Sequence, residues 1–151
     1  MTGSLVTAEI DQILRTERLG RIGCYSNGKV YVVPTTFAYD GKYIYGHSRE
    51  GQKIEMMRKN PNICFEIDSM EDMANWKSVI VQGVYQELMG SAGEEALKLF
   101  MEKLESNTAD DRNISSHGMV QFHHDEQSVV KTVVYRILVL EKTGRYEKTI
   151  Y

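Results

Sequence analysis

Apolar residues along most of this chain recur with the two-residue period of β-strands. The clearest example is segment 78–88, SVIVQGVYQEL, in which alternate positions fall on opposite faces. Similar strand-like runs occur at 21–25, 30–39, 43–47, 63–68 and 132–140. Asn27-Gly28 and Asp40-Gly41 are typical of the short turns that join the first three runs into two hairpins. The pattern therefore predicts six or more strands.

Three segments have helical spacing instead. In the first, Ile10, Ile13 and Leu14 form one apolar stripe, with Thr7 as the expected N-cap and Gly20 as the expected end. The other two predicted helices are 51–59, which stops before Asn60-Pro61, and 91–104. Segment 107–128 is predicted to be a loop with a helical turn, and 141–151 reads as a charged, aromatic tail.

Strands joined mainly by hairpins predict an antiparallel sheet, and closing that sheet removes its exposed edges. We therefore expect one mainly-β domain over residues 1–151, a small β-barrel with peripheral helices.

Composition narrows the class of protein. The chain is 42% hydrophobic and 26% charged, which is ordinary for a soluble globular protein, and its net charge of −3 argues against nucleic-acid binding. We find neither an apolar run long enough to span a membrane nor a signal peptide. Cys24 and Cys64 are interpreted as small buried hydrophobes in a reducing cytoplasm, with a disulfide or redox pair as the alternative.

Proline within a strand-like run is the first candidate for function. Pro34 lacks a ladder donor, so it marks an edge, a bulge or backbone that faces something other than a strand. The hydroxyl groups of Thr35 and Thr36 and the free backbone groups can then bind a planar polar ring. The alternative is a plain edge strand with a bulge.

A second candidate follows the strand at 43–47. His47 and Ser48 precede Gly51 and Lys53 at a predicted helix start, and together they offer hydroxyl, amide and ammonium donors to a phosphate. The alternative is that Ser48 caps the helix and Lys53 is solvated. The chain has neither a Walker loop nor a GxGxxG motif.

Trp76 either covers a ligand ring or closes one end of the barrel, and Ser78 can reach the same ligand from a neighbouring strand. His117, His123 and His124 lack the spacing of a zinc site, so we expect no metal.

Taken in order, these pieces resemble a known family. GRIGCYS, VPTTFAYDGKYIYGHS, GQK, NPNICFEID, WKSVIVQGVYQEL and TGRYEK are similar to the FMN-binding split-barrel superfamily. Within it, the resemblance is to pyridoxamine 5′-phosphate oxidase-related flavoproteins close to the nitroimidazole-resistance (Nim-like) proteins, and it spans about residues 19–148.

The resemblance implies a six-stranded antiparallel split barrel of Greek-key type that binds FMN. It implies that residues 33–36 line the isoalloxazine ring and that His47, Ser48 and Lys53 meet the ribityl phosphate. It implies that Ser78 reaches the flavin from the next strand. The implied cofactor-binding residues are Val33, Pro34, Thr35, Thr36, Phe37, His47, Ser48, Lys53 and Ser78. It also implies a homodimer with flavin sites at the subunit interface, to which Trp76 or Arg145 of the partner contributes.

The sequence departs from the oxidase pattern at two places. Gln52 stands where the oxidases have an arginine, and Arg145-Tyr146-Glu147 replaces their arginine–x–histidine. We therefore expect an oxidoreductase that passes electrons from a donor such as NAD(P)H to a small-molecule acceptor, rather than a vitamin B6 oxidase. The alternatives are a protein that binds or stores flavin, haem or deazaflavin without turnover, and a structural homodimer without a ligand.

Overall fold

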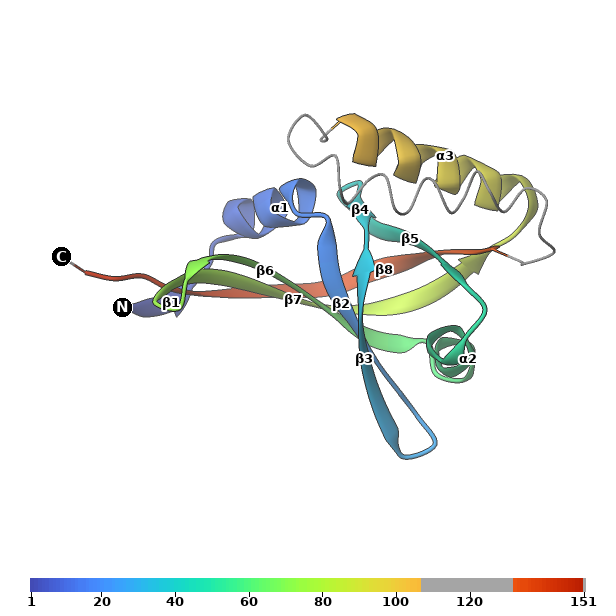
Figure 1. Cartoon of the computed structure of the whole chain (residues 1–151), viewed down its shortest axis with the longest axis horizontal. Coiled ribbons are helices and arrows are strands. Elements are labelled where there is room, and N and C mark those ends of the chain that lie inside the picture. The colour runs from blue at the N-terminus through green and yellow to red at the C-terminus, as the bar shows by residue number, and fades with distance from the viewer. Residues whose placement is uncertain (107–131, 151) are drawn as a thin grey trace.

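The computed structural model describes residues 1–106 and 132–150, in which it has eight strands and three helices (Figure 1). The strands are β1 (Thr2–Ser4), β2 (Leu19–Ser26), β3 (Lys29–Thr36), β4 (Ala38–Tyr39), β5 (Tyr43–Arg49), β6 (Asn62–Asp72), β7 (Asn75–Leu88) and β8 (Thr132–Glu147). The helices are α1 (Thr7–Thr16), α2 (Gln52–Lys59) and α3 (Gly90–Ser106).

All the strands belong to one antiparallel sheet with the order β3-β2-β6-β7-β8-β5-β4, and β1 pairs with the end of β8. Because the two outermost strands, β3 and β4, are separated only by Phe37, the sheet curls until its ends approach each other. The predicted antiparallel, mainly-β split-barrel fold is confirmed. The described residues contain eight strands rather than six, because short β1 and β4 add to the count.

The inner face of the curled sheet forms the main core, in which Ile22, Phe65 and Val81 are fully buried. Helix α1 packs on this core through the predicted stripe of Ile10, Ile13 and Leu14. A second, smaller cluster around Phe100 joins α3 to β4 and β5. Figure 1 shows α1 and α3 on one side of the sheet and α2 near the β2–β3 hairpin.

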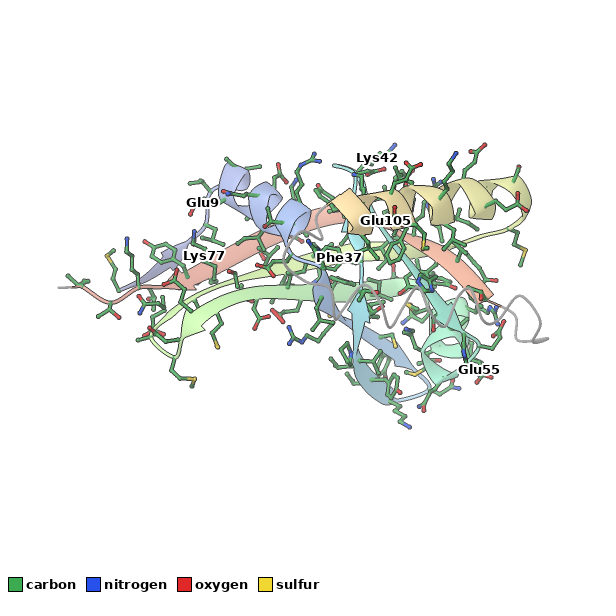
Figure 2. The ribbon with its side chains drawn as sticks, turned by 45° about the horizontal axis from the view of Figure 1, so that its top comes forward. Glu9, Phe37, Lys42, Glu55, Lys77 and Glu105 are labelled. Atoms are coloured by element: carbon green, nitrogen blue, oxygen red, sulfur yellow. The ribbon has the colours of Figure 1, made fainter. Side chains whose placement is uncertain are left out.

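Ion pairs also attach α1 to the sheet. Glu9 of α1 faces Lys77 of β7, at 3.3 Å (Figure 2). The Lys142 ammonium on β8 donates to the Asp11 carboxylate and, at 3.3 Å, to the Tyr39 hydroxyl. These contacts fix the position of α1 relative to β4.

The boundaries of α1 differ from the prediction. Its N-cap is Val6 rather than Thr7, and it ends at Thr16, so Gly20 already belongs to β2. A Cβ at Gly20 would lie 2.2 Å from the Phe65 ring. The glycine is therefore required by close packing and does not end a helix.

Three other boundaries were also predicted wrongly. The run 30–39 is interrupted at Phe37 and forms two strands. The runs 63–68 and 78–88 extend towards each other and form the β6–β7 hairpin. The expected tail continues β8 as far as Glu147, where it pairs with β7 and β1. The segment 107–128, which was predicted to be a loop, lies outside the described residues.

Both cysteines are free thiols. Cys24 points into the core, whereas Cys64 pairs with Gly23 and therefore lies on the opposite face of the sheet. The disulfide alternative is therefore wrong. The interpretation as a buried hydrophobe holds for Cys24, and Cys64 is half-buried.

Candidate functional site

The segment that was expected to bind a ring lies on the edge strand β3. Of the possibilities that Pro34 left open, the structure shows an edge strand, and the β2–β3 register runs without a bulge. Backbone groups on the outer side of an edge strand have no ladder partner. They are available to the polar rim of a planar ligand, which is the contact expected of Val33 to Thr36.

Alternation along β3 separates these residues into two faces. Thr35 points inward and is 8% exposed, whereas Pro34 on the opposite face is exposed. The Thr35 hydroxyl lies 3.4 Å from the hydroxyl of Tyr135 on β8. Burial raises the pKa of Tyr135 to about 12, so the phenol stays protonated and either oxygen can be the donor.

Phe37 lies beyond the end of β3 and is 1% exposed. Its ring packs edge-on against Phe65 with 5.1 Å between the centroids, and its N–H donates to the Arg18 carbonyl oxygen. The ring is therefore part of the core, on the side of the sheet that α1 covers.

The expected phosphate-binding residues meet at the start of α2. The N-cap is Gly51, which provides no side-chain cap, so the interpretation that Ser48 caps this helix is wrong. The Ser48 hydroxyl donates instead to the Arg49 carbonyl oxygen, at 2.9 Å. The first N–H groups of α2 thus lack a side-chain cap, as expected of a helix start that receives an anion.

Lys53 on α2 is half-buried between β2 and β5 rather than solvated, so that part of the alternative is also wrong. Burial lowers the pKa of the Lys53 ammonium, and nearby Cys24 opposes this shift. Burial also lowers the pKa of His47, and Lys53 lowers it further. Two groups that favour an anion therefore lie close together in a site that disfavours their positive charge.

Cys24 connects this cluster to β3. Its thiol donates to the Tyr31 carbonyl oxygen at 3.7 Å, and burial raises its pKa although Lys53 opposes the change. His47 packs edge-on against Phe100 of α3, with 5.0 Å between the ring centroids. These contacts place Cys24 of β2 and His47 of β5 close to Lys53 at the start of α2.

Ser78 lies elsewhere in the chain. It is on β7, and β2 and β6 lie between β7 and β3 in the sheet. The prediction that Ser78 lies on a strand next to the ring-binding segment is therefore wrong within one chain. The Ser78 hydroxyl donates to the Glu66 carboxylate at 3.1 Å. Arg21 pairs with Asp68 at 2.7 Å and lies 3.6 Å from Glu66.

Trp76 also lies away from the β3–α2 region. Its indole N–H donates to the Glu147 carboxylate at 3.0 Å, and it lines a cleft of about 370 Å³ between α1 and the β6–β7 hairpin. The structure therefore brings together the predicted residues of β3, β5 and α2 and leaves those of β7 apart.

The sequence reasoning missed two contacts of this site, Tyr135 and the approach of Cys24 to Lys53. The glycine at position 46 was a usable signal, because a Cβ there would lie 2.6 Å from the Tyr135 hydroxyl oxygen. A glycine inside a strand is typical of such a close approach.

His117, His123 and His124 lie outside the described residues. Within residues 1–106 and 132–150, no cluster of three or more His, Cys, Asp or Glu could hold a metal ion. Among the same residues, no helix is both long and apolar enough to cross a membrane.

The curled antiparallel sheet, with helices at its periphery, has the split-barrel fold. Residues 7–146 match the model of the pyridoxamine 5′-phosphate oxidase family, and the chain belongs to that family.

Relatives agree with this assignment. The chain is similar to the crystal structure of an FAD-binding protein from Mesorhizobium loti, with 31% identity, coverage of 99% of this chain and 98% of the other, and a TM-score of 0.72. A 5-nitroimidazole antibiotic resistance protein from Bacteroides thetaiotaomicron shares the fold, with 22% identity, coverage of 97% and 87%, and a TM-score of 0.70. An uncharacterized protein of Rhizobium meliloti (strain 1021) is 38% identical over 85 residues, which are 56% of each chain.

Proposed function

We propose that this protein binds a flavin, FMN, along the β3 edge and at the start of α2. The observation that carries the proposal is that half-buried Lys53 lies close to His47 at the start of α2. This helix begins at Gly51 without a side-chain cap. A phosphate there would stabilise the Lys53 ammonium, favour the protonated form of His47 and accept hydrogen bonds from the helix N–H groups. The Lys53 ammonium, the His47 imidazole and the first N–H groups of α2 are suitable hydrogen-bond donors for a ribityl phosphate.

The same site has a surface for the ring. The outer edge of β3 at Val33–Thr36, which pairs with no further strand among the described residues, can hydrogen-bond the polar rim of the ring. Tyr135 lies within hydrogen-bond distance of Thr35. When bound, a flavin supplies hydride and electron transfer. The chain's own part is to hold the phosphate, align the ring and limit access to it.

FAD is the second candidate cofactor, because the relative from Mesorhizobium loti is named as FAD-binding. Both flavins share the phosphate that Lys53 would contact. Heat release of the flavin from the purified full chain, followed by chromatography against FMN and FAD standards, distinguishes them. A colourless protein that gains no flavin absorbance with either one refutes the proposal.

We further propose that the bound flavin passes electrons from NAD(P)H to a small acceptor, and that pyridoxamine 5′-phosphate is not the substrate. Gln52 and Arg145 are the reasons, since Arg145 is exposed and donates to the Ser4 hydroxyl at 3.2 Å. Anaerobic titration with NADH and NADPH tests the proposal. Bleaching of the flavin at a turnover rate supports an enzyme, whereas a flavin that stays oxidised indicates storage or binding alone.

A second copy of this chain is the proposed partner, seated on the outer face of β3, β2, β6 and β7. The pairing register places Val30, Val32 and Ile80 on this face, and they are 69%, 61% and 44% exposed. Arg21 and Asp68, which form an ion pair, lie on the same face and give it both signs of charge, which is compatible with a self-complementary two-fold interface. Ser78 also lies there, so a partner's Ser78 would have access to the site.

Substitution Val30→Lys tests this interface by placing a charge where the second copy would pack. We expect a shift from dimer to monomer in analytical ultracentrifugation, with weaker flavin binding. Met89→Lys is the matched control, because Met89 is 74% exposed but lies between β7 and α3, away from this face. A Val30→Lys protein that keeps the mass of the unsubstituted chain contradicts the proposal, as does a monomeric unsubstituted chain.

A further inference from the structure

The two ends of the short helix α2 are attached to the chain in different ways. Its body is anchored in the core, where Ile54 and Met57 are fully buried. The segment that leads into it, residues 49–52, is exposed throughout. A helix of eight residues is marginal by itself, so its orientation depends on tertiary contacts. The start of α2 therefore depends on contacts other than apolar burial.

A polar bridge joins this start to the sheet. The Arg58 guanidinium, in the last turn of α2, donates to both carboxylate oxygens of Glu50, at 2.7 and 2.8 Å. It also donates to both carboxylate oxygens of Glu87 on β7, at 2.8 and 3.1 Å. One side chain thus connects the residue that precedes the Gly51 N-cap to a strand of the sheet. We call Glu50, Arg58 and Glu87 the Arg58 bridge.

The sheet end of the Arg58 bridge is the more buried end. The Glu87 side chain is 18% exposed, against 41% for Arg58 and 44% for Glu50. The Tyr85 hydroxyl donates to the Glu87 carboxylate at 2.8 Å. Burial and this hydrogen bond raise the pKa of Tyr85, so the phenol stays protonated as the donor. Glu87 is therefore held by the sheet, and Arg58 holds Glu50 to it.

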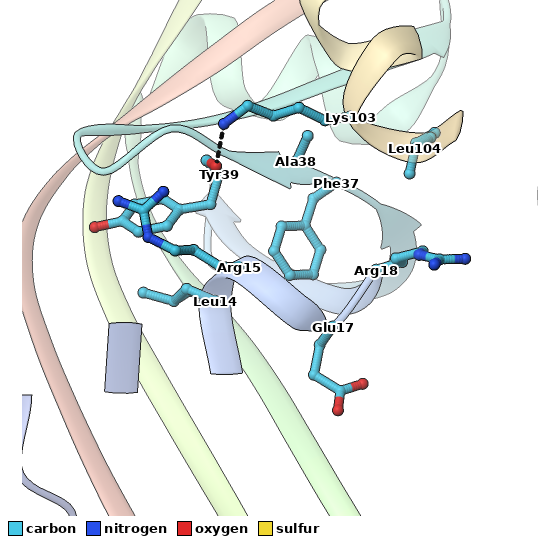
Figure 3. Close-up of a pocket in the computed structure, with 9 residues that line it drawn as sticks. All are labelled: Leu14, Arg15, Glu17, Arg18, Phe37, Ala38, Tyr39, Lys103 and Leu104. Carbon is cyan, nitrogen blue, oxygen red and sulfur yellow. Dashed lines mark hydrogen bonds between the residues drawn. The ribbon is translucent and has the colours of Figure 1, made fainter. Parts of the chain in front are cut away.

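This arrangement depends on the shape of the arginine side chain. A planar guanidinium can pair with two carboxylates at once, each through two hydrogen bonds. Exposed ion pairs usually contribute little, but bidentate pairs within a network are an exception. A lysine has a compact ammonium without this fork, as on α3, where Lys103 donates to the Tyr39 carbonyl oxygen at 2.7 Å (Figure 3). A lysine at position 58 would keep the charge without reproducing both bidentate pairs.

We propose that Arg58 is a positioning residue for the phosphate end of the flavin site. By holding Glu50 to Glu87 it fixes the first turn of α2, so that the helix N–H groups and Lys53 are preorganised for the phosphate. This role rests on the proposed function, because the phosphate is that of the proposed flavin. Arg58 lies about two turns from the start of the helix and acts through Glu50 rather than through the ligand.

The FMN affinity of two charge-matched variants tests the proposal. Arg58→Met and Lys59→Met each remove one positive charge from the last turn of α2, and both residues are exposed. Arg58→Met should weaken FMN binding about fivefold, the upper end of the range for an exposed ion pair, whereas Lys59→Met should leave the Kd unchanged. Arg58→Lys should recover little of the lost affinity. Circular dichroism of each variant verifies that the fold is retained.

Glu50 gives the test a definite sign. If charge alone mattered, removing this acid next to the start of α2 would strengthen the binding of a phosphate. The Arg58 bridge predicts the opposite, because Glu50→Met detaches the first turn from Arg58. We expect FMN binding about threefold weaker in Glu50→Met, and a double variant with Arg58→Met that binds no more weakly than Arg58→Met alone.

Amide hydrogen exchange in the flavin-free chain follows the same bridge without a ligand. The Glu55 N–H donates to the Gly51 carbonyl oxygen at 3.1 Å and reports on the first turn of α2. It should exchange about fivefold faster in Arg58→Met, in line with the loss of FMN affinity. The Phe37 N–H, which donates to the Arg18 carbonyl oxygen outside α2, should keep its exchange rate.

Four results would overturn the proposal. They are equal FMN affinity in Arg58→Met and Lys59→Met, full recovery of affinity in Arg58→Lys, stronger FMN binding by Glu50→Met, and unchanged Glu55 exchange in Arg58→Met. An unsubstituted chain that binds no flavin refutes the proposed function instead, and Glu55 exchange then still decides whether Arg58 fixes the start of α2. Weaker FMN binding by both Arg58→Met and Glu50→Met, with faster exchange confined to α2, supports the proposal.

Discussion

Replacing Lys53 with methionine distinguishes the contribution of Lys53 to flavin binding from its contribution to the stability of the fold. Methionine has a similar length and no charge, so it can occupy the same half-buried space. Burial lowers the Lys53 pKa, which means that the folded state disfavours the ammonium relative to the unfolded state. At neutral pH the charge therefore destabilises the flavin-free protein, and Lys53→Met should raise its Tm.

The same substitution should weaken flavin binding. A hydrogen bond to a charged group contributes about 1.5–3 kcal/mol, which corresponds to roughly a 10- to 150-fold change in Kd. Partial burial favours the upper part of this range, because a less polar environment strengthens the attraction between ammonium and phosphate. Stability and affinity are thus expected to change in opposite directions.

The assay combines flavin titration by fluorescence quenching with thermal unfolding of the flavin-free chain. Lys59→Met is the matched control, since Lys59 is exposed in the last turn of the same helix. It should leave the flavin Kd unchanged, and its Tm should stay constant or fall slightly because a cation favours the helix C-terminus.

Two results would refute the reasoning about Lys53. One is an unchanged flavin Kd in the Lys53→Met protein, which would remove Lys53 from the phosphate site. The other is a lower Tm of the flavin-free variant, which would mean that the ammonium stabilises the fold and that its burial is compensated.

Other consequences can be measured directly. Burial and Lys53 lower the His47 pKa, so His47 in the flavin-free chain should titrate below the usual value of about 6.5. Bound flavin phosphate should raise the His47 pKa. The affinity for flavin should therefore increase as the pH falls through that pKa. NMR titration, assigned with a His47→Gln variant, tests this, and a pKa that stays constant or falls on flavin binding contradicts it. Gly46→Ala places a Cβ 2.6 Å from the Tyr135 hydroxyl oxygen and should cost about 1–3 kcal/mol, or about 2–4 °C of Tm per kcal/mol. Calorimetry showing no loss of Tm would mean that Tyr135 moves aside freely.

Much of the local structure was predictable because it depends on local chemistry. Asn27-Gly28 forms the predicted turn, with φ of 51° and 76°, values that asparagine and glycine tolerate better than most residues. The stripe of Ile10, Ile13 and Leu14 is buried as expected, and α2 ends before Asn60 as the following proline requires. These features depend on a few residues and their immediate neighbours.

Other features depended on contacts between distant residues. Gly20 was interpreted as a helix end, but it is a glycine because the Phe65 ring, 45 positions along the chain, lies against it. The continuation of β8 into the charged tail depended on its pairing with β7 and β1, because an exposed polar run has no strand signal of its own.

For the candidate site, the chemical groups could be identified from the sequence: a proline-marked strand, two threonines, and a histidine and lysine around a helix start. Which of these groups lie close together depends on contacts between distant parts of the chain. Curling of the sheet brings Thr35 to Tyr135, and packing of α2 places Lys53 near Cys24 and His47. The order of the strands places Ser78 away from these residues. That order is selected by long-range pairing and burial, which the local sequence pattern does not specify.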